Sequence, residues 1–80
     1  MELGPVTDAD LQLLEALKVW RRDEARSQGV PAYVILHDST LVELARRRPT
    51  DLMQMTGISG IGAKRLERYG AALLRLVRAA

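Results

Sequence analysis

The chain has 80 residues, of which 48% are hydrophobic, with 12 basic and 10 acidic residues and a net charge of +2 at pH 7. This is enough apolar material for one packed domain and argues against disorder, although the length is near the lower limit for a core held by packing alone. The lack of cysteine and the single histidine exclude a thiolate nucleophile, a disulfide framework and a zinc site. We expect no metal and no cofactor.

Residues 1–7 are interpreted as a linker or chain end, and residues 8–80 as the domain. The first residues lack the basic and apolar regions of a signal peptide, and no apolar run reaches the length of a membrane span. We therefore expect a cytoplasmic protein.

The first helix is predicted from about Asp8 to Gln28, with Thr7 or Asp8 as its cap. Its apolar residues fall within an arc of roughly 140°, as one core-facing stripe requires: Leu13, Leu14, Leu17, Trp20 and Ala25. Opposite them, Lys18, Arg22 and Arg26 follow one another at intervals of one helical turn. This basic stripe is either a phosphate-binding track or an ordinary solvated face.

The most apolar stretch of the chain, residues 30–41, is expected to be buried. Gly29 and Pro31 should end the preceding helix, and no other segment offers a strand for this one to pair with. We therefore predict a short buried segment between two helices. Tyr33 is its one residue with an aromatic face and a polar tip, so it either stacks on a base or is a core tyrosine whose hydroxyl reaches the surface.

The third helix is predicted over residues 38–48, ended by Pro49. Asp38 is expected to cap it rather than to act as a catalytic acid, His37 to lie at the cap or on the surface, and residues 40–43 to form a capping box. Arg46, Arg47 and Arg48 then fall in the last turn, where cations complement the helix dipole.

A short fourth helix should begin after Thr50 or Asp51 and close at Gly57, with Met53 and Met55 as core-filling residues. The last helix is predicted from about Ile61 to Arg78. Its apolar face includes Gly70, which we expect to allow another helix to approach closely. The whole chain is thus predicted to be all-α, with five helices and short loops.

A glycine-punctuated turn, Gly60-Ile61-Gly62, leads into the last helix. It is similar to the hairpin of helix-hairpin-helix motifs, in which backbone N–H groups at a helix N-terminus meet a phosphate. Lys64 and Arg65 would supply charge there. The same glycines would serve equally well if they only made the turn tight. The sequence pairs no nucleophile with a base and has no nucleotide-binding loop, so we do not expect an enzyme.

Three blocks of the sequence resemble the HRDC domain (helicase and RNase D C-terminal) of bacterial RecQ-type DNA helicases. They are Leu17-Lys18-Val19-Trp20-Arg21, the stretch from Val30 to Leu41, and the stretch from Ile58 to Gly70. The resemblance covers nearly the whole chain and implies a compact five-helix bundle.

The resemblance also implies a function. An HRDC domain of this kind would be a non-catalytic accessory domain, monomeric in isolation, that binds single-stranded or branched DNA weakly in a nucleoid-associated enzyme. Tyr33 matches a DNA-contacting tyrosine of bacterial members. The other expected DNA-binding residues are Lys18, Arg22, Arg26, Gly60, Gly62, Lys64 and Arg68. The alternative is a module that docks on other domains of the helicase or on a partner protein, and RNA binding is a third possibility.

Overall fold

Five α-helices make up the computed structural model, which describes residues 4–80. They are α1 (Asp8–Gln28), α2 (Ala32–Ile35), α3 (Asp38–Arg47), α4 (Leu52–Met55) and α5 (Ala63–Ala79). The described residues contain no strand, so the all-α prediction with five helices is confirmed. None of the described helices is both long enough and apolar enough to span a membrane.

Helix α1 begins and ends where its sequence signals predict. The Thr7 hydroxyl accepts a hydrogen bond from the Asp10 N–H, and the Asp10 carboxylate accepts one from the Thr7 N–H, which completes a capping box. At the other end Gly29 adopts a left-handed conformation with φ of 67°. The longest helix is therefore limited at both ends by local interactions.

The apolar stretch 30–41 is only partly buried. Ile35, Leu36 and Leu41 are inaccessible to solvent or nearly so, whereas Tyr33 and Val34 are exposed. The expectation that the whole stretch lies inside was wrong, because α2 is a single turn of helix and one turn has an outer face as well as an inner one.

The capping box expected at residues 40–43 is also wrong. Helix α3 begins at Asp38, with His37 in the cap position and no side-chain capping bond, so the expectation that Asp38 caps this helix was wrong. Thr40 is buried, and both Thr40 and Glu43 bond to the backbone of a distant turn instead. At its other end α3 stops at Arg47, one residue before the predicted boundary, and Arg48 adopts a left-handed conformation with φ of 49°.

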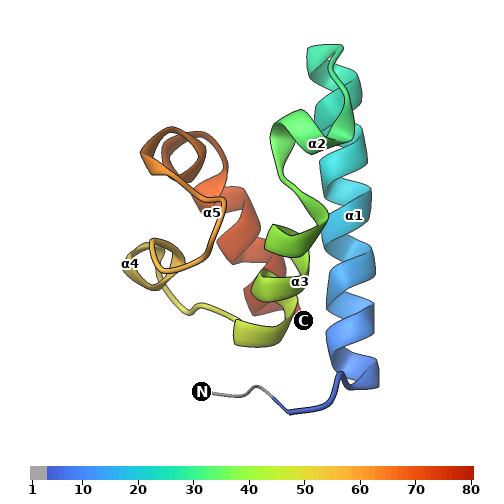
Figure 1. Ribbon diagram of the computed structural model, residues 1–80, viewed down its shortest axis with the longest axis vertical. Coiled ribbons are helices and arrows are strands. Elements are labelled where there is room, and N and C mark those ends of the chain that lie inside the picture. The colour runs from blue at the N-terminus through green and yellow to red at the C-terminus, as the bar shows by residue number, and fades with distance from the viewer. Residues whose placement is uncertain (1–3) are drawn as a thin grey trace.

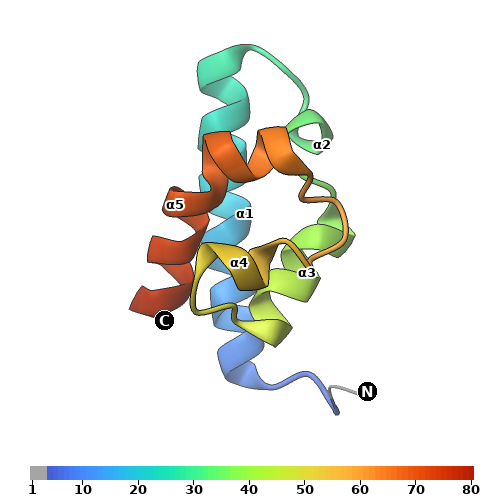
Figure 2. The same ribbon diagram turned by 90° about the vertical axis from the view of Figure 1, so that its left-hand side faces the viewer.

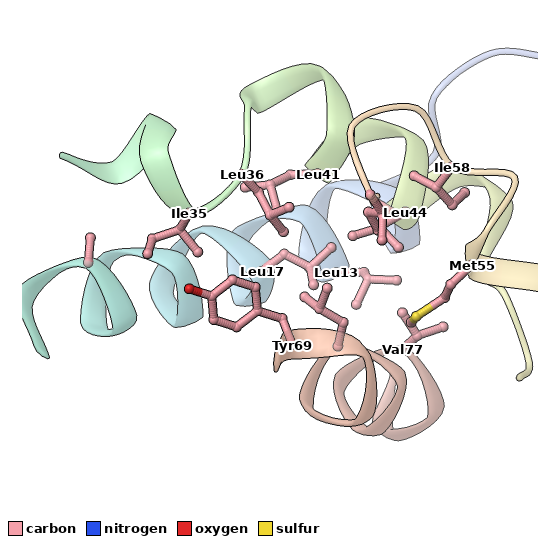
Figure 3. Close-up of a cluster of buried hydrophobic side chains, with 14 residues drawn as sticks. Leu13, Leu17, Ile35, Leu36, Leu41, Leu44, Met55, Ile58, Tyr69 and Val77 are labelled. Atoms are coloured by element: carbon pink, nitrogen blue, oxygen red, sulfur yellow. The ribbon is translucent and has the colours of Figure 1, made fainter. Parts of the chain in front are cut away.

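All five helices contribute to one core, which Figure 3 shows in close-up. Leu13 and Leu17 of α1 belong to the same buried cluster as Leu73 of α5, together with side chains of α2, α3 and α4. The predicted apolar faces of α1 and α5 are thereby confirmed. Helix α5 starts at Ala63 rather than Ile61, because Gly62 has an extended backbone and is the N-cap residue, which leaves Ile61 in the preceding turn.

The short helix α4 lies against α5, on the side of the molecule away from α1 (Figures 1 and 2). A Cβ atom on Gly70 would stand 2.9 Å from the Cδ2 atom of Leu52, so the predicted close helix approach at this glycine is confirmed. Asp51 caps α4 by accepting from the Gln54 N–H. Of its two methionines only Met55 is buried. Met53 is 82% exposed, which corrects the expectation that both fill the core.

We expect Leu17→Ala and Leu73→Ala each to lower the free energy of unfolding by about 2–5 kcal/mol, since each side chain is fully buried and its removal leaves a cavity. Denaturant titration followed by circular dichroism measures this. Tyr33→Ala is the matched control, because its side chain is exposed and its loss should leave the midpoint nearly unchanged. A midpoint for Leu17→Ala equal to that of the unmodified chain would contradict the described core.

Candidate nucleic-acid interface

Tyr33 lies on the outer face of α2 with 62% of its surface exposed. It borders an open, shallow depression lined by Arg21, Ala32, His37, Asp38 and Ser39. The alternative of a core tyrosine is thereby excluded, because a ring this exposed contributes little to the core. The same depression gathers one aromatic ring with several polar side chains.

Two arginines from different helices bond to carbonyl groups at the end of α2. The Arg21 guanidinium of α1 donates to the Leu36 carbonyl at 2.9 Å. From α5, Arg65 donates to the carbonyls of Ile35 and Val34 at 3.0 and 3.2 Å. The last carbonyl groups of a helix have no partner within it, and in a one-turn helix these are all of its carbonyl groups. The arginine bonds supply partners for the last of them. They fix the position of the segment that carries Tyr33.

Asp38, at the start of α3, lies beside Arg21. Its carboxylate accepts from Arg21 at 2.7 Å, and its side chain is otherwise largely exposed. The hydrogen bond from Arg21 and the positive charge of that guanidinium hold the pKa of the Asp38 carboxyl below its ordinary value, and the charges of Lys18 and His37 act in the same direction. Lys18 is therefore close enough to contribute to the potential around Asp38. Asp38 is an ion-pair partner at the helix N-terminus, where a negative charge is favourable.

The basic stripe of α1 is solvent-exposed along its length. Lys18, Arg22 and Arg26 are all exposed, and Arg22 approaches the Asp23 carboxylate at 3.8 Å. The stripe is accessible to a ligand and is partly neutralised by a neighbouring acid.

The two glycines of the turn before α5 have different roles. Gly60 has φ of +91°, and a Cβ atom there would collide with the Thr40 hydroxyl. That hydroxyl donates to the Ser59 carbonyl at 2.8 Å, while the Ser59 N–H donates to Glu43 at 2.7 Å. Gly60 is thus required by the fold. Gly62 has an ordinary φ of −84°, and a Cβ atom there would meet nothing within 4 Å.

The N-terminus of α5 lies next to α2, because Arg65 reaches the carbonyl of Val34, the residue after Tyr33. Gly62 is the N-cap residue of α5 and forms no side-chain capping bond, and the first turn contains no acidic residue. Lys64 and Arg68 are both exposed. The Arg68 guanidinium lies 5.2 Å from the centre of the Tyr69 ring, which itself packs edge-on against Trp20 of α1. Helices α1 and α5 are therefore in contact.

The structure thus brings Tyr33 near the α5 N-terminus, and it pairs Asp38 with Arg21, one turn after Lys18 on α1. It also shows roles that the sequence did not reveal. Arg65 was expected to supply charge to a phosphate, but it is bonded to α2, and Arg21 had no predicted role. The polar residues of the depression, His37, Asp38 and Ser39, follow α2 directly in the sequence, and this proximity to Tyr33 was the available signal.

A model of the HRDC domain matches residues 10–77. The chain belongs to the HRDC family. Among curated proteins, it is 49% identical over 71 residues to the ATP-dependent DNA helicase UvrD2 of Mycobacterium tuberculosis, a match that covers 89% of this chain and 10% of the helicase. It is 33% identical over 73 residues to the ATP-dependent DNA helicase RecQ of Haemophilus influenzae, covering 91% of this chain and 12% of that protein.

Among solved structures, the D. radiodurans RecQ HRDC domain 3 matches with a TM-score of 0.84 and 34% identity, over 88% of this chain and 92% of that chain. The HRDC fold expected from the sequence is therefore confirmed. The chain spans only about a tenth of the length of the helicases that it matches. These relatives include both RecQ and UvrD2 helicases.

The two turn glycines of this HRDC domain should differ when substituted. We expect Gly60→Ala to lower the free energy of unfolding by about 1–2 kcal/mol or more, because of the positive φ and the collision with Thr40. Gly62→Ala should change it little, since its Cβ atom enters open space. Denaturant midpoints of the two variants test this, and equal losses would contradict the described turn.

The pKa of Asp38 should depend on Arg21. Carboxyl chemical shifts followed through an acid titration should place the Asp38 midpoint below the ordinary range, and Arg21→Met should raise it. The ion pair should stabilise the fold above about pH 4 and cease to do so as the pH falls through the lowered pKa. A midpoint that does not move in Arg21→Met would show that the ion pair is not formed in solution.

Proposed function

We propose that this HRDC domain is a non-catalytic accessory domain of a RecQ-type or related bacterial DNA helicase. In this proposal it binds single-stranded or branched DNA weakly and tunes which DNA structures the helicase engages. The observation that carries the proposal is the exposed ring of Tyr33, displayed on a segment that two arginines hold fixed. The DNA helicases among its relatives support the same assignment.

Tyr33 is suited to stacking on an unpaired base. Its ring is 62% exposed, and it stands on α2. Arg21 and Arg65 donate hydrogen bonds to the carbonyl groups at the end of this helix. A ring on a fixed segment loses little conformational freedom on binding, so more of the stacking energy appears as affinity. Base stacking on an aromatic side chain contributes on the order of 1–3 kcal/mol and tolerates any sequence. This is the behaviour expected of a domain that recognises DNA structure rather than sequence.

The α1 stripe would supply phosphate contacts near this ring. Lys18 lies one turn before Arg21 on α1, and Arg21 pairs with Asp38, which shares the depression with Tyr33. Arg22 and Arg26 continue the stripe by one turn each. Asp23 and Asp38 reduce the local positive potential. Because affinity for nucleic acid depends on the number of phosphates neutralised, a net charge of +2 fits weak, salt-sensitive binding.

The N-terminus of α5 would extend the contact surface. The fold requires glycine at position 60 but not at position 62, where open space adjoins the first N–H groups of α5. A phosphate could approach those N–H groups closely at Gly62, with Lys64 and Arg68 providing charge. A phosphate site would explain why glycine occupies position 62, for which the packing gives no reason.

The first test is fluorescence anisotropy of a labelled single strand titrated with the domain at low and at physiological salt. Tyr33→Ala should weaken binding by roughly 5- to 150-fold, the equivalent of one lost stacking contact. Met53→Ala, which removes another highly exposed side chain on a different helix, is the matched control and should not change the affinity. Equal affinities of the Tyr33→Ala variant and the unmodified chain would remove the stacking proposal.

The salt dependence of the same titration separates phosphate contacts from stacking. Lys18→Ala and Arg22→Ala should each reduce the slope of log affinity against log salt by about 0.7, whereas Tyr33→Ala should leave the slope unchanged. Gly62→Ala should weaken binding without lowering stability. A single-stranded RNA of the same sequence, used as a competitor, tests whether DNA is the preferred ligand.

The second candidate function is a protein-interaction module with little DNA affinity. The observation in its favour is the exposed apolar surface of α4, where Leu52 is 44% and Met53 is 82% exposed. A folded domain that shows no DNA binding even at low salt would favour this function.

A further inference from the structure

A groove on the α4 and α5 side of the molecule has an apolar floor and a basic edge. It is lined by Leu52 of α4 and by Ala71, Leu74, Arg75 and Arg78 of α5. We refer to these five residues as the α4/α5 groove. Met53, the next residue after Leu52, extends the exposed apolar surface. Figures 1 and 2 place α4 away from α1, so this surface is separate from the α1 basic stripe.

The fold does not account for the exposure of these apolar side chains. Leu52 packs its Cδ2 atom against the backbone at Gly70, yet 44% of the residue stays exposed. Met53 is 82% exposed on a helix of only four residues, in which the neighbouring Met55 is fully buried. Methionine is flexible and polarizable, and is common on surfaces that adapt to apolar partners. Both side chains would lose solvent contact if a partner covered the groove.

The charges at the groove point to the chemistry of that partner. Neither Arg75 nor Arg78 takes part in an ion pair within residues 4–80, although Arg78 donates to the Thr50 carbonyl at 3.0 Å. The nearby carboxylate of Asp51 is occupied as the N-cap of α4. Within α5 the acidic residue is Glu67, which lies two turns before Arg75 and forms no ion pair with it. The groove therefore presents, beside an apolar floor, two guanidinium groups that have no carboxylate partner among residues 4–80.

We propose that the α4/α5 groove binds an amphipathic helical segment of a protein, with an apolar stripe flanked by Asp or Glu residues. The apolar stripe would cover Leu52, Met53 and Leu74, and the flanking carboxylates would pair with Arg75 and Arg78. DNA is a poorer fit, because phosphates would pair with the arginines but leave the apolar floor exposed to water. This inference develops the protein-interaction candidate and does not depend on DNA binding at Tyr33.

The test uses isotope-labelled chain and a helical peptide built of alternating Leu-Leu and Glu-Glu pairs. Amide shift changes should centre on α4 and the second half of α5. A peptide with Lys in place of every Glu should bind at least about tenfold more weakly, because it would meet the two arginines with like charge. No binding of the Glu peptide, or equal binding of both peptides, overturns the proposal.

Variants locate the site. Met53→Asp and Arg75→Glu should each weaken binding of the Glu peptide about tenfold or more, as expected for central contacts of a small interface. Leu11→Asp is the matched control for the first, since Leu11 is a 53% exposed apolar residue on α1, and it should have no effect. Arg22→Glu, which reverses the charge of an exposed arginine on α1, is the matched control for Arg75→Glu and should likewise have no effect on peptide binding.

A single-stranded oligonucleotide distinguishes the two ligand classes on the same labelled chain. It should leave the amides of α4 unshifted, and Arg75→Glu should not weaken its binding as strongly as Tyr33→Ala does. If the oligonucleotide shifts the groove residues, or if the peptide shifts α2 instead, the assignment to a protein ligand is overturned. Failure of Tyr33 to affect DNA binding would leave the groove result unchanged, so the two proposals fail separately.

Discussion

Much of this domain depends on one requirement, which is that the carbonyl groups at the end of α2 find hydrogen-bond partners outside that helix. A four-residue helix has no stability of its own, since the cost of nucleation is not recovered in one turn. Here Arg21 and Arg65 provide partners for the carbonyls of Val34, Ile35 and Leu36. Because these arginines come from α1 and α5, the same three bonds also connect the first and last helices. The consequence is that Tyr33 lies exposed on a segment that is bonded to two other helices.

A second connection ties the turn before α5 to α3. Thr40 and Glu43 bond both backbone groups of Ser59, and Gly60 leaves the space that the Thr40 hydroxyl occupies. The start of α5 is thereby fixed relative to α3, and through Arg65 relative to α2. The proposed base-stacking ring and the proposed phosphate site are thus parts of one rigid arrangement. Under the proposed function, such an arrangement would favour recognition of nucleic-acid shape, because both contacts would have to be met at a set spacing.

The exposed surface divides into two regions with different chemistry. Around Tyr33 the side chains are polar and of mixed charge, with Arg21 and Lys18 near Asp38. At the α4/α5 groove they are apolar with two arginines that have no carboxylate partner among the described residues. In the two proposals, the first region would contact a nucleic acid and the second a protein segment. That division suits a domain whose relatives belong to much longer helicases.

The sequence by itself determined the five helices, the bounds of α1, the apolar faces of α1 and α5, and the family, because caps, glycines and helical periodicity act over a few residues. The tertiary structure decided the roles of side chains whose partners are distant in the sequence. Thr40 met Ser59 instead of capping α3, Arg65 bonded α2 instead of remaining free, and Met53 faced solvent. The sequence placed Tyr33 at the start of the right segment but left its burial open. Only the packing of α2 on α1, together with the Arg65 bonds from α5, determined which face of that single turn points outward.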